Sequence, residues 1–158
     1  MSTKTSGKNL IHTILVLFVL INIIGDIGNV AFWWASPSSQ GSIVGGEMGG
    51  IPMTGGYLKS AIGADATLIV ASVLLIVVAV VYLVALFGLL KKQKWGALLV
   101  IVISVVNRVI ALFLFEISGA FAFWGIWTVI LVVAAYLDYR KLSSPSAPPT
   151  APIEAKPA

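Results

Sequence analysis

The sequence predicts an all-α integral membrane protein: a four-helix transmembrane bundle, mostly up-and-down, with a Gly-rich outer loop between helices 1 and 2. The first observation behind this class is composition, because 59% of the 158 residues are hydrophobic and 10% are charged, whereas an average soluble domain is about one quarter charged. The second is that the apolar residues form four runs, each long enough for a bilayer core that needs about 20 residues per helix.

The four predicted spans and their connections form one transmembrane domain over residues 1–141. The first two spans exceed the minimum length, so we expect them to tilt or to project beyond the lipid. The short connections at 91–94 and 116–119 make spans two, three and four consecutive antiparallel neighbours. The spans lie at 10–34, 64–90, 95–115 and 120–139.

The beginning of the chain has the charge pattern of a secretory signal, because Lys4 and Lys8 precede an apolar run. The apolar region of a signal peptide covers about 7–15 residues and ends at small residues. This run instead continues to Trp34 without such a cleavage site. We therefore expect the first span to be a signal anchor that stays in the protein.

The arrangement of four spans places the basic residues on one side of the membrane. Lys4, Lys8, the turn 91–94 and the pair Arg140–Lys141 all fall on that side. The positive-inside rule identifies it as the cytoplasmic side. Both termini are then cytoplasmic, and the segment 35–63 is extracytoplasmic.

Two segments lie outside the predicted spans. The segment 35–63 contains three glycine pairs and little that could form a core, so it is predicted to be an irregular loop. Met48 and Met53 in this loop are soft donors for copper(I). Without a nearby His or Cys they are weak candidates for a metal site, and flexible packing is the simpler interpretation. Residues 142–158 are rich in Pro, Ala and Ser, which predicts a disordered cytoplasmic tail.

Six polar side chains inside the apolar spans are the most informative feature of the sequence. On the first and the third span, three of them follow one another at helical spacing, on one face or beside it. Lipid cannot satisfy these groups, so we expect both rows to face the bundle interior or a partner protein. The six residues are Asn22, Asp26, Asn29, Ser104, Asn107 and Arg108.

Asp26 and Arg108 are the two charged members of this polar cluster. Counting 1.5 Å per residue from Trp34 and from Glu116 places each about 12 Å below the outer surface, so a direct or water-bridged ion pair is feasible. One interpretation is a structural clamp that fixes the register of the helices. The other is a transport or binding site, because intramembrane charges often serve one. The clamp is favoured because the two charges cancel.

Two further acids, Asp65 and Glu116, lie at the outer boundaries of spans two and three, where carboxylates reach water. Asp65 falls in the first turn of its predicted helix. A negative charge there is favourable because it meets the positive end of the helix macrodipole. Capping is therefore the simpler interpretation of Asp65.

The residue types that most cofactor sites need are scarce. Cysteine is absent and His12 is the single histidine, which excludes thiolate metal sites and a bis-histidine haem. We interpret His12 as an interfacial residue. No GxSxG, HExxH, Walker or GxGxxG motif occurs in the chain. We therefore predict no cofactor and no catalytic residue, and the scattered basic residues do not indicate a nucleic-acid partner.

Two functions of different kinds fit these observations. The first is a non-catalytic accessory or assembly subunit of a larger membrane complex in the cell membrane, with lipid and a membrane protein as its partners. The second is a small transporter or channel that uses the layer of Asp26 and Arg108. Four helices alone rarely enclose a pathway, so the second function requires a homo-oligomer.

The topology can be tested by labelling single cysteines introduced into the cysteine-free chain. We expect Ser42→Cys to react with an impermeant maleimide added to sealed cells, because position 42 is in the predicted outer loop. Ser144→Cys should react only after the membrane is permeabilised, because the basic residues place it inside. Labelling of both positions from outside would contradict this topology.

Overall fold

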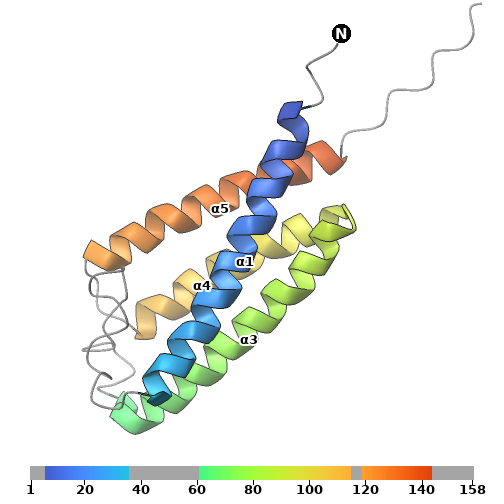
Figure 1. Ribbon diagram of the computed structural model, residues 1–158. Helices are drawn as coiled ribbons and strands as arrows, with labels where there is room; N and C mark the ends of the chain where they lie inside the picture. The colour runs from blue at the N-terminus through green and yellow to red at the C-terminus, as the bar shows by residue number, and fades with distance from the viewer. Residues whose placement is uncertain (1–5, 36–60, 115–118, 144–158) are drawn as a thin grey trace, which may run out of the picture.

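The computed structural model shows an all-helical protein (Figure 1). It describes residues 6–35, 61–114 and 119–143. Helix α1 packs along α3, α3 along α4, and α4 along α5, while α1 meets α5 less extensively. Helices α1 and α4 are therefore diagonal partners in a four-helix bundle. The helices are α1 (Ser6–Ala35), α3 (Ala64–Leu90), α4 (Lys94–Leu114) and α5 (Gly119–Ser143).

The helix bounds agree closely with the predicted spans. Helix α3 has the predicted bounds, and α4 begins and ends one residue earlier than predicted. Helix α1 begins about one turn earlier, and α5 ends about one turn later. Polar residues such as Lys are good helix formers, so a helix continues beyond the apolar run that predicts it. Most of the predicted outer loop and tail, residues 36–60 and 144–158, lies outside the described residues.

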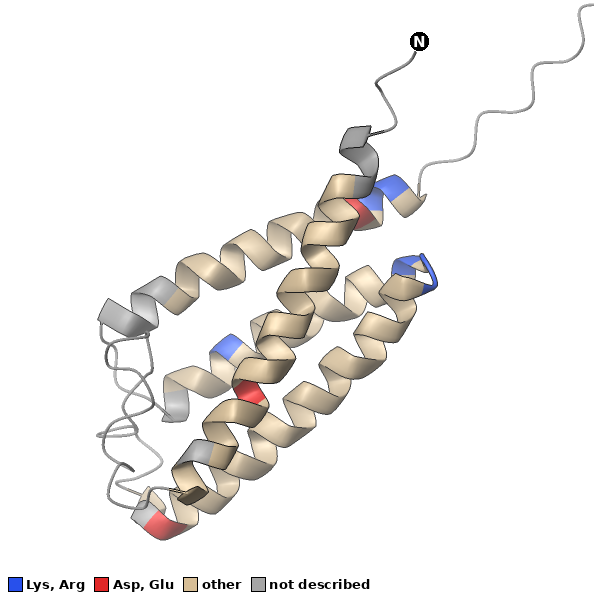
Figure 2. Ribbon diagram, in the orientation of Figure 1, with Lys and Arg blue, Asp and Glu red and all other residues tan. Residues whose placement is uncertain are grey.

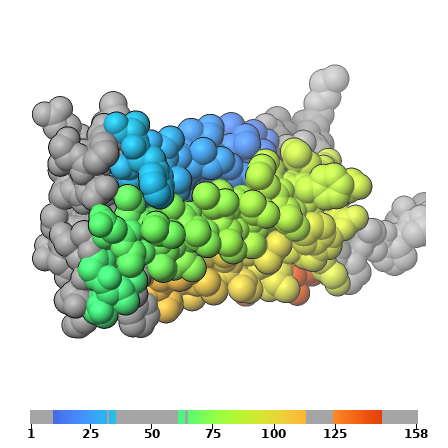
Figure 3. Space-filling view, turned by 90° about the horizontal axis from the view of Figure 1, so that it is seen from below, coloured from blue at the N-terminus to red at the C-terminus, as the bar shows by residue number. Residues whose placement is uncertain are grey.

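Among the described residues, three helices are long and apolar enough to cross a membrane, over Leu10–Ala35, Asp65–Leu90 and Lys94–Leu112. Many large apolar side chains lie exposed on the outside of the bundle, as at Ile24 (70%) and Ile126 (63%). Figure 3 shows α1, α3 and α4 side by side along one face of the molecule. These features support a membrane protein, and the fourth crossing, by α5, stays a prediction.

The two ends of the bundle differ in their charged residues (Figure 2). The start of α1, the turn between α3 and α4, and the end of α5 lie together at one end. Apart from Arg108, the described basic side chains gather there, so we call it the basic end. The opposite end, where α1 ends and α3 begins with Asp65, is called the far end.

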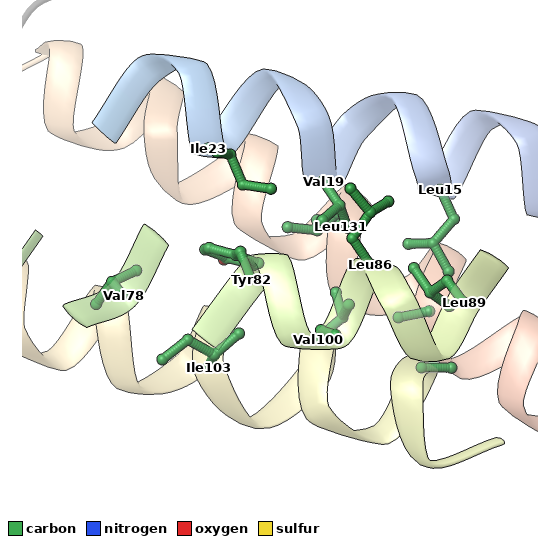
Figure 4. Close-up of a cluster of buried hydrophobic side chains, with 13 residues drawn as sticks. Leu15, Val19, Ile23, Val78, Tyr82, Leu86, Leu89, Val100, Ile103 and Leu131 are labelled. Carbon is green, nitrogen blue, oxygen red and sulfur yellow. The ribbon is translucent and has the colours of Figure 1, made fainter. Parts of the chain in front are cut away.

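The buried apolar side chains form two clusters. The larger cluster lies toward the basic end and receives residues from all four helices, among them Leu15, Val19, Leu86 and Leu131 (Figure 4). The smaller cluster lies toward the far end, and its described members come from α1, α3 and α4 alone. These members are Trp33, Leu68, Ala71, Leu75 and Ala111, with Val30, Leu74 and Ile110 packed against them.

A tight turn joins α3 to α4 at the basic end. The backbone N–H of Lys92 donates to Leu89 O at 2.7 Å, and that of Gln93 donates to Gly88 O at 2.9 Å. This is the hydrogen-bond pattern of a Schellman motif. Lys92 takes the left-handed position with φ 53°, where glycine is more usual. The motif ends α3 and starts α4 within three residues, which makes the two helices antiparallel.

Two glycines let α3 and α4 approach each other closely beside this turn. A Cβ atom on Gly96 would lie 2.6 Å from both Gly88 C and Leu89 N, and 2.9 Å from Ala85 O. A Cβ on Gly88 would lie 2.8 Å from Gly96 Cα. All four atoms belong to the backbone, so a side chain at either position must push the two helices apart.

We expect Gly96→Ala to lower the thermal stability of the detergent-solubilised protein, by roughly 1–3 kcal/mol, because overpacking moves backbone. Gly125→Ala is the matched control, since a Cβ there meets no described atom within 4 Å. The control should be neutral or slightly stabilising, because Ala is the better helix former by about 1 kcal/mol. Equal melting temperatures for Gly96→Ala and the wild type would contradict the close approach.

Candidate functional site

Five polar side chains meet at middle depth, in the region between the two apolar clusters. Asp26 lies in α1 between Ile23 of the larger cluster and Trp33 of the smaller one. The other members come from the remaining three helices, and electrostatic interactions or hydrogen bonds connect them. We call this group the polar layer. It consists of Asp26 (α1), Tyr82 (α3), Ser104 and Arg108 (α4), and Thr128 (α5).

Asp26 is buried on the inward face of α1. Leu15, Val19 and Ile23 precede it at helical spacing on the same face and belong to the larger cluster. Asp26 is 9% exposed, and its Oδ2 atom is enclosed without a hydrogen-bond partner. An ionised carboxylate in such surroundings is unfavourable unless it is paired. Asp26 is therefore the member of the layer that a further hydrogen-bond donor or positive charge would stabilise.

Tyr82 and Ser104 connect α3 to α4 within the layer. Ser104 Oγ donates its single hydrogen to Val100 O at 2.6 Å. At 3.0 Å from Ser104 Oγ, the Tyr82 hydroxyl is therefore the donor to that atom. Tyr82 is 1% exposed, and Asp26 and Arg108 both lie in the surroundings of its hydroxyl. The two charged groups therefore belong to the same layer as the tyrosine.

Arg108 connects α4 to α5 rather than to Asp26. Its Nη2 donates to Trp124 O at 2.5 Å and to Thr128 Oγ1 at 2.8 Å. Thr128 donates its own hydroxyl hydrogen to Trp124 O at 2.8 Å, so it acts only as an acceptor toward the guanidinium. Among the described residues no ion pair forms between Asp26 and Arg108. The direct contact that equal depth made feasible is therefore not formed.

The remaining members of the predicted cluster lie apart from these contacts. Asn22 Nδ2 donates to Phe18 O of its own helix at 2.8 Å. Asn29 and Asn107 are partly exposed. Asp65 is exposed in the first turn of α3, as the capping interpretation expects.

The described part of the chain does not include the candidate metal ligands. Met48, Met53 and Glu116 lie outside the described residues. Within residues 6–35, 61–114 and 119–143, no group of three or more His, Cys, Asp and Glu side chains gathers to hold a metal ion.

A hydrogen bond at the basic end joins two residues whose partnership the sequence did not predict. His12 Nδ1 of α1 lies 2.9 Å from Asp138 Oδ2 of α5. Asp138 is 1% exposed and the His12 side chain is 18% exposed. His12 was predicted to be interfacial, but the structure gives it a partner that is distant in sequence. The pair fixes the start of α1 against the end of α5.

The burial of Asp138 had a signal in the sequence. Thr128, Leu131, Ala135 and Asp138 recur at spacings of three, four and three, which places them on one helical face. Leu131 and Ala135 belong to the larger apolar cluster, so this face points inward. The neighbouring Arg140 and Lys141 mask the signal, because an acid beside a basic pair resembles a solvated interface.

Comparison of the chain with protein-family models, with curated proteins and with solved structures finds no match. The function is therefore inferred from the polar layer and from the pair of His12 and Asp138. The layer holds the helices in register, and at Asp26 it can accept a proton, a cation or a hydrogen-bond donor. The pair is a fixed contact between the first and last helices.

We expect His12→Leu and Asp138→Leu each to destabilise the detergent-solubilised protein by about 1–3 kcal/mol, because each change removes the hydrogen bond and leaves the polar group of the other residue without this partner. The double variant should be less destabilised than the sum of the two. Asp65→Asn is the control, and the exposed position should change stability by less than about 0.5 kcal/mol. Strict additivity of His12→Leu and Asp138→Leu would show that the contact contributes nothing.

Two double-mutant cycles compare Thr128 and Asp26 as partners of Arg108. Arg108→Gln and Thr128→Val should be coupled by about 1–2 kcal/mol, because the guanidinium donates directly to the hydroxyl. The coupling between Arg108→Gln and Asp26→Asn should be smaller, because no direct bond connects them. Thermal unfolding in detergent gives both energies. A larger coupling with Asp26 would restore the direct ion pair.

Proposed function

We propose that the protein is a non-catalytic accessory or assembly subunit of a larger membrane complex. In this proposal all four helices cross the cell membrane, with the basic end in the cytoplasm and the segment 35–63 outside. The accumulation of Lys and Arg at one end supports that orientation, because the positive-inside rule retains basic segments in the cytoplasm.

The observation that carries the proposal is the use of polar side chains between helices. Polar groups that bind or transform a substrate must be directed toward a site that a substrate can reach. In the described part of this chain several of them contact another helix instead, which is the arrangement of a structural bundle. The contacts are Tyr82 to Ser104, Arg108 to Thr128, Trp34 Nε1 to Ser72 Oγ at 3.0 Å, and His12 to Asp138.

A second function, transport by a homo-oligomer, is favoured by Asp26 alone. Its Oδ2 atom is enclosed without a hydrogen-bond partner, and intramembrane carboxylates often bind protons or cations during transport. Because Arg108 is held by α5, the charge of Asp26 is not cancelled through a direct contact, as the clamp interpretation required. The polar layer would then have to open to water within an oligomer.

Purification from native membranes tests the main proposal. We expect the tagged protein to co-purify with a stoichiometric set of larger membrane proteins, because an accessory subunit stays bound to its complex. A homo-oligomer without other proteins would contradict this proposal.

Reconstitution of the purified protein alone in liposomes tests the transport alternative. We expect no proton or cation flux above that of protein-free liposomes. A flux that Asp26→Asn abolishes, in a variant whose melting temperature shows that it is folded, would establish transport instead. Asp65→Asn is the matched control, because its carboxylate is exposed at the far end.

A further inference from the structure

We propose that α1 and α5 leave a seam in the far half of the bundle, and that this seam receives a transmembrane helix of a partner protein. The partner helix carries one basic side chain at the depth of Asp26. The seam is lined on α1 by Asn22, Gly25, Asp26 and Asn29. The inference rests on the proposed function, because it names the surface by which the subunit would bind its complex.

In the described part of the chain, the side-chain contacts between α1 and α5 extend from the basic end to middle depth. They include the pair of His12 and Asp138 at the basic end and the rings of Phe18 and Trp127 at middle depth, whose centroids lie 4.5 Å apart. Figure 1 shows the two helices crossing near the basic end and separating toward the far end. The smaller apolar cluster accordingly has no described member from α5.

The face of α1 that contacts α5 at Phe18 continues toward the far end beyond that contact. Phe18, Asn22, Gly25 and Asn29 recur at spacings of four, three and four, so they share one face. Phe18 packs on Trp127, whereas the three residues after it are only partly buried. A Cβ atom on Gly25 would meet no described atom within 4 Å. This face therefore loses its neighbour at Asn22.

Asp26 borders this face, and a positive charge from a partner would stabilise its carboxylate. Asp26 follows Gly25 directly and is 9% exposed, its Oδ2 lacks a hydrogen-bond partner, and no ion pair of its carboxylate forms with another described residue. A lipid chain on this face would bring no donor, so the carboxylate would stay unpaired in hydrocarbon. A second copy of the chain would bring Arg108, but that guanidinium is already bonded to α5. A partner helix with its own basic residue satisfies the carboxylate.

Gly25 makes such an approach sterically possible. Membrane helices associate where small residues let their backbones come close, and polar side chains then bind across the interface. Here a small residue and an unpaired acid are adjacent in the sequence, at a place where the bundle has no described neighbour. The two requirements of a polar helix interface therefore coincide at one position of α1.

A synthetic transmembrane peptide serves as the probe. It is a Leu/Ala helix of about 21 residues with one Lys about eight residues from its outer end, which matches the depth of Asp26. A matched peptide carries Leu in place of Lys. The full-length protein is labelled with a donor fluorophore in phosphatidylcholine vesicles, each peptide carries the acceptor, and energy transfer is followed as peptide is added.

We expect the wild type to bind the Lys peptide about tenfold more tightly than the Leu peptide, the ratio given by one interhelical polar contact. Asp26→Asn should abolish this preference, and Asp65→Asn should retain it. Gly25→Leu should also abolish it by blocking the approach while the carboxylate stays in place, so the test does not depend on the folding of Asp26→Asn. Equal affinity of the wild type for both peptides would overturn the proposal, as would a preference that survives Asp26→Asn.

Two further measurements separate this inference from the proposed function. If energy transfer between two labelled copies depends on Asp26, the occupant is a second copy and the partner-helix proposal is wrong. If the wild type and Asp26→Asn both co-purify with the same stoichiometric partners from native membranes, the subunit function holds and the seam is wrong. If the wild type co-purifies with none, the proposed function fails, and the peptide measurement still decides whether the seam binds a basic helix.

Discussion

Polar side chains buried in an apolar bundle are the constraint on which the rest of this structure depends. Between helices in lipid, apolar contacts discriminate poorly among registers, because lipid tails are as apolar as the side chains. A hydrogen bond between helices discriminates sharply, since a shift of one residue leaves its donor and acceptor unsatisfied. Tyr82 with Ser104 fixes α3 against α4, and Arg108 with Thr128 fixes α4 against α5. The two apolar clusters fill the space on either side of these contacts.

The four helices are held together unequally. Helices α3 and α4 approach closely beside the short turn that joins them, because Gly88 and Gly96 have room for no side chain. Helix α1 is fixed on α3 by Trp34 and Ser72, and in the described part of the chain its side chains contact α5 from the basic end to middle depth, at His12 and Phe18. If the bundle opens, we therefore expect α1 to separate from α5 before α3 separates from α4.

Much of the fold could be predicted from the sequence, because long apolar runs and short connections leave few alternatives. The bounds of α3 followed from the apolar run alone. The contacts of the site could not be predicted in the same way. Equal depth placed Asp26 and Arg108 in one layer, but depth does not determine which neighbouring helix an arginine faces. That choice depends on the rotation of α4, which brings Arg108 onto Trp124 and Thr128. The partnership of His12 with Asp138 likewise depends on how α1 crosses α5.

Asp26 differs from the other members of the polar layer in its hydrogen bonding. Each of the other members has a hydrogen-bond partner on another helix, and Ser104 and Thr128 also donate to a backbone carbonyl of their own helix. The enclosed oxygen of Asp26 has none. A bundle selected only for stability would gain by replacing this acid with an apolar residue, because an unpaired buried charge is unfavourable. Its position beside Gly25, on the part of α1 that α5 does not cover, connects that stability cost with a surface for association. Asp26, the residue of the layer whose hydrogen-bonding capacity is least satisfied, is therefore the residue at which a functional interaction is best tested.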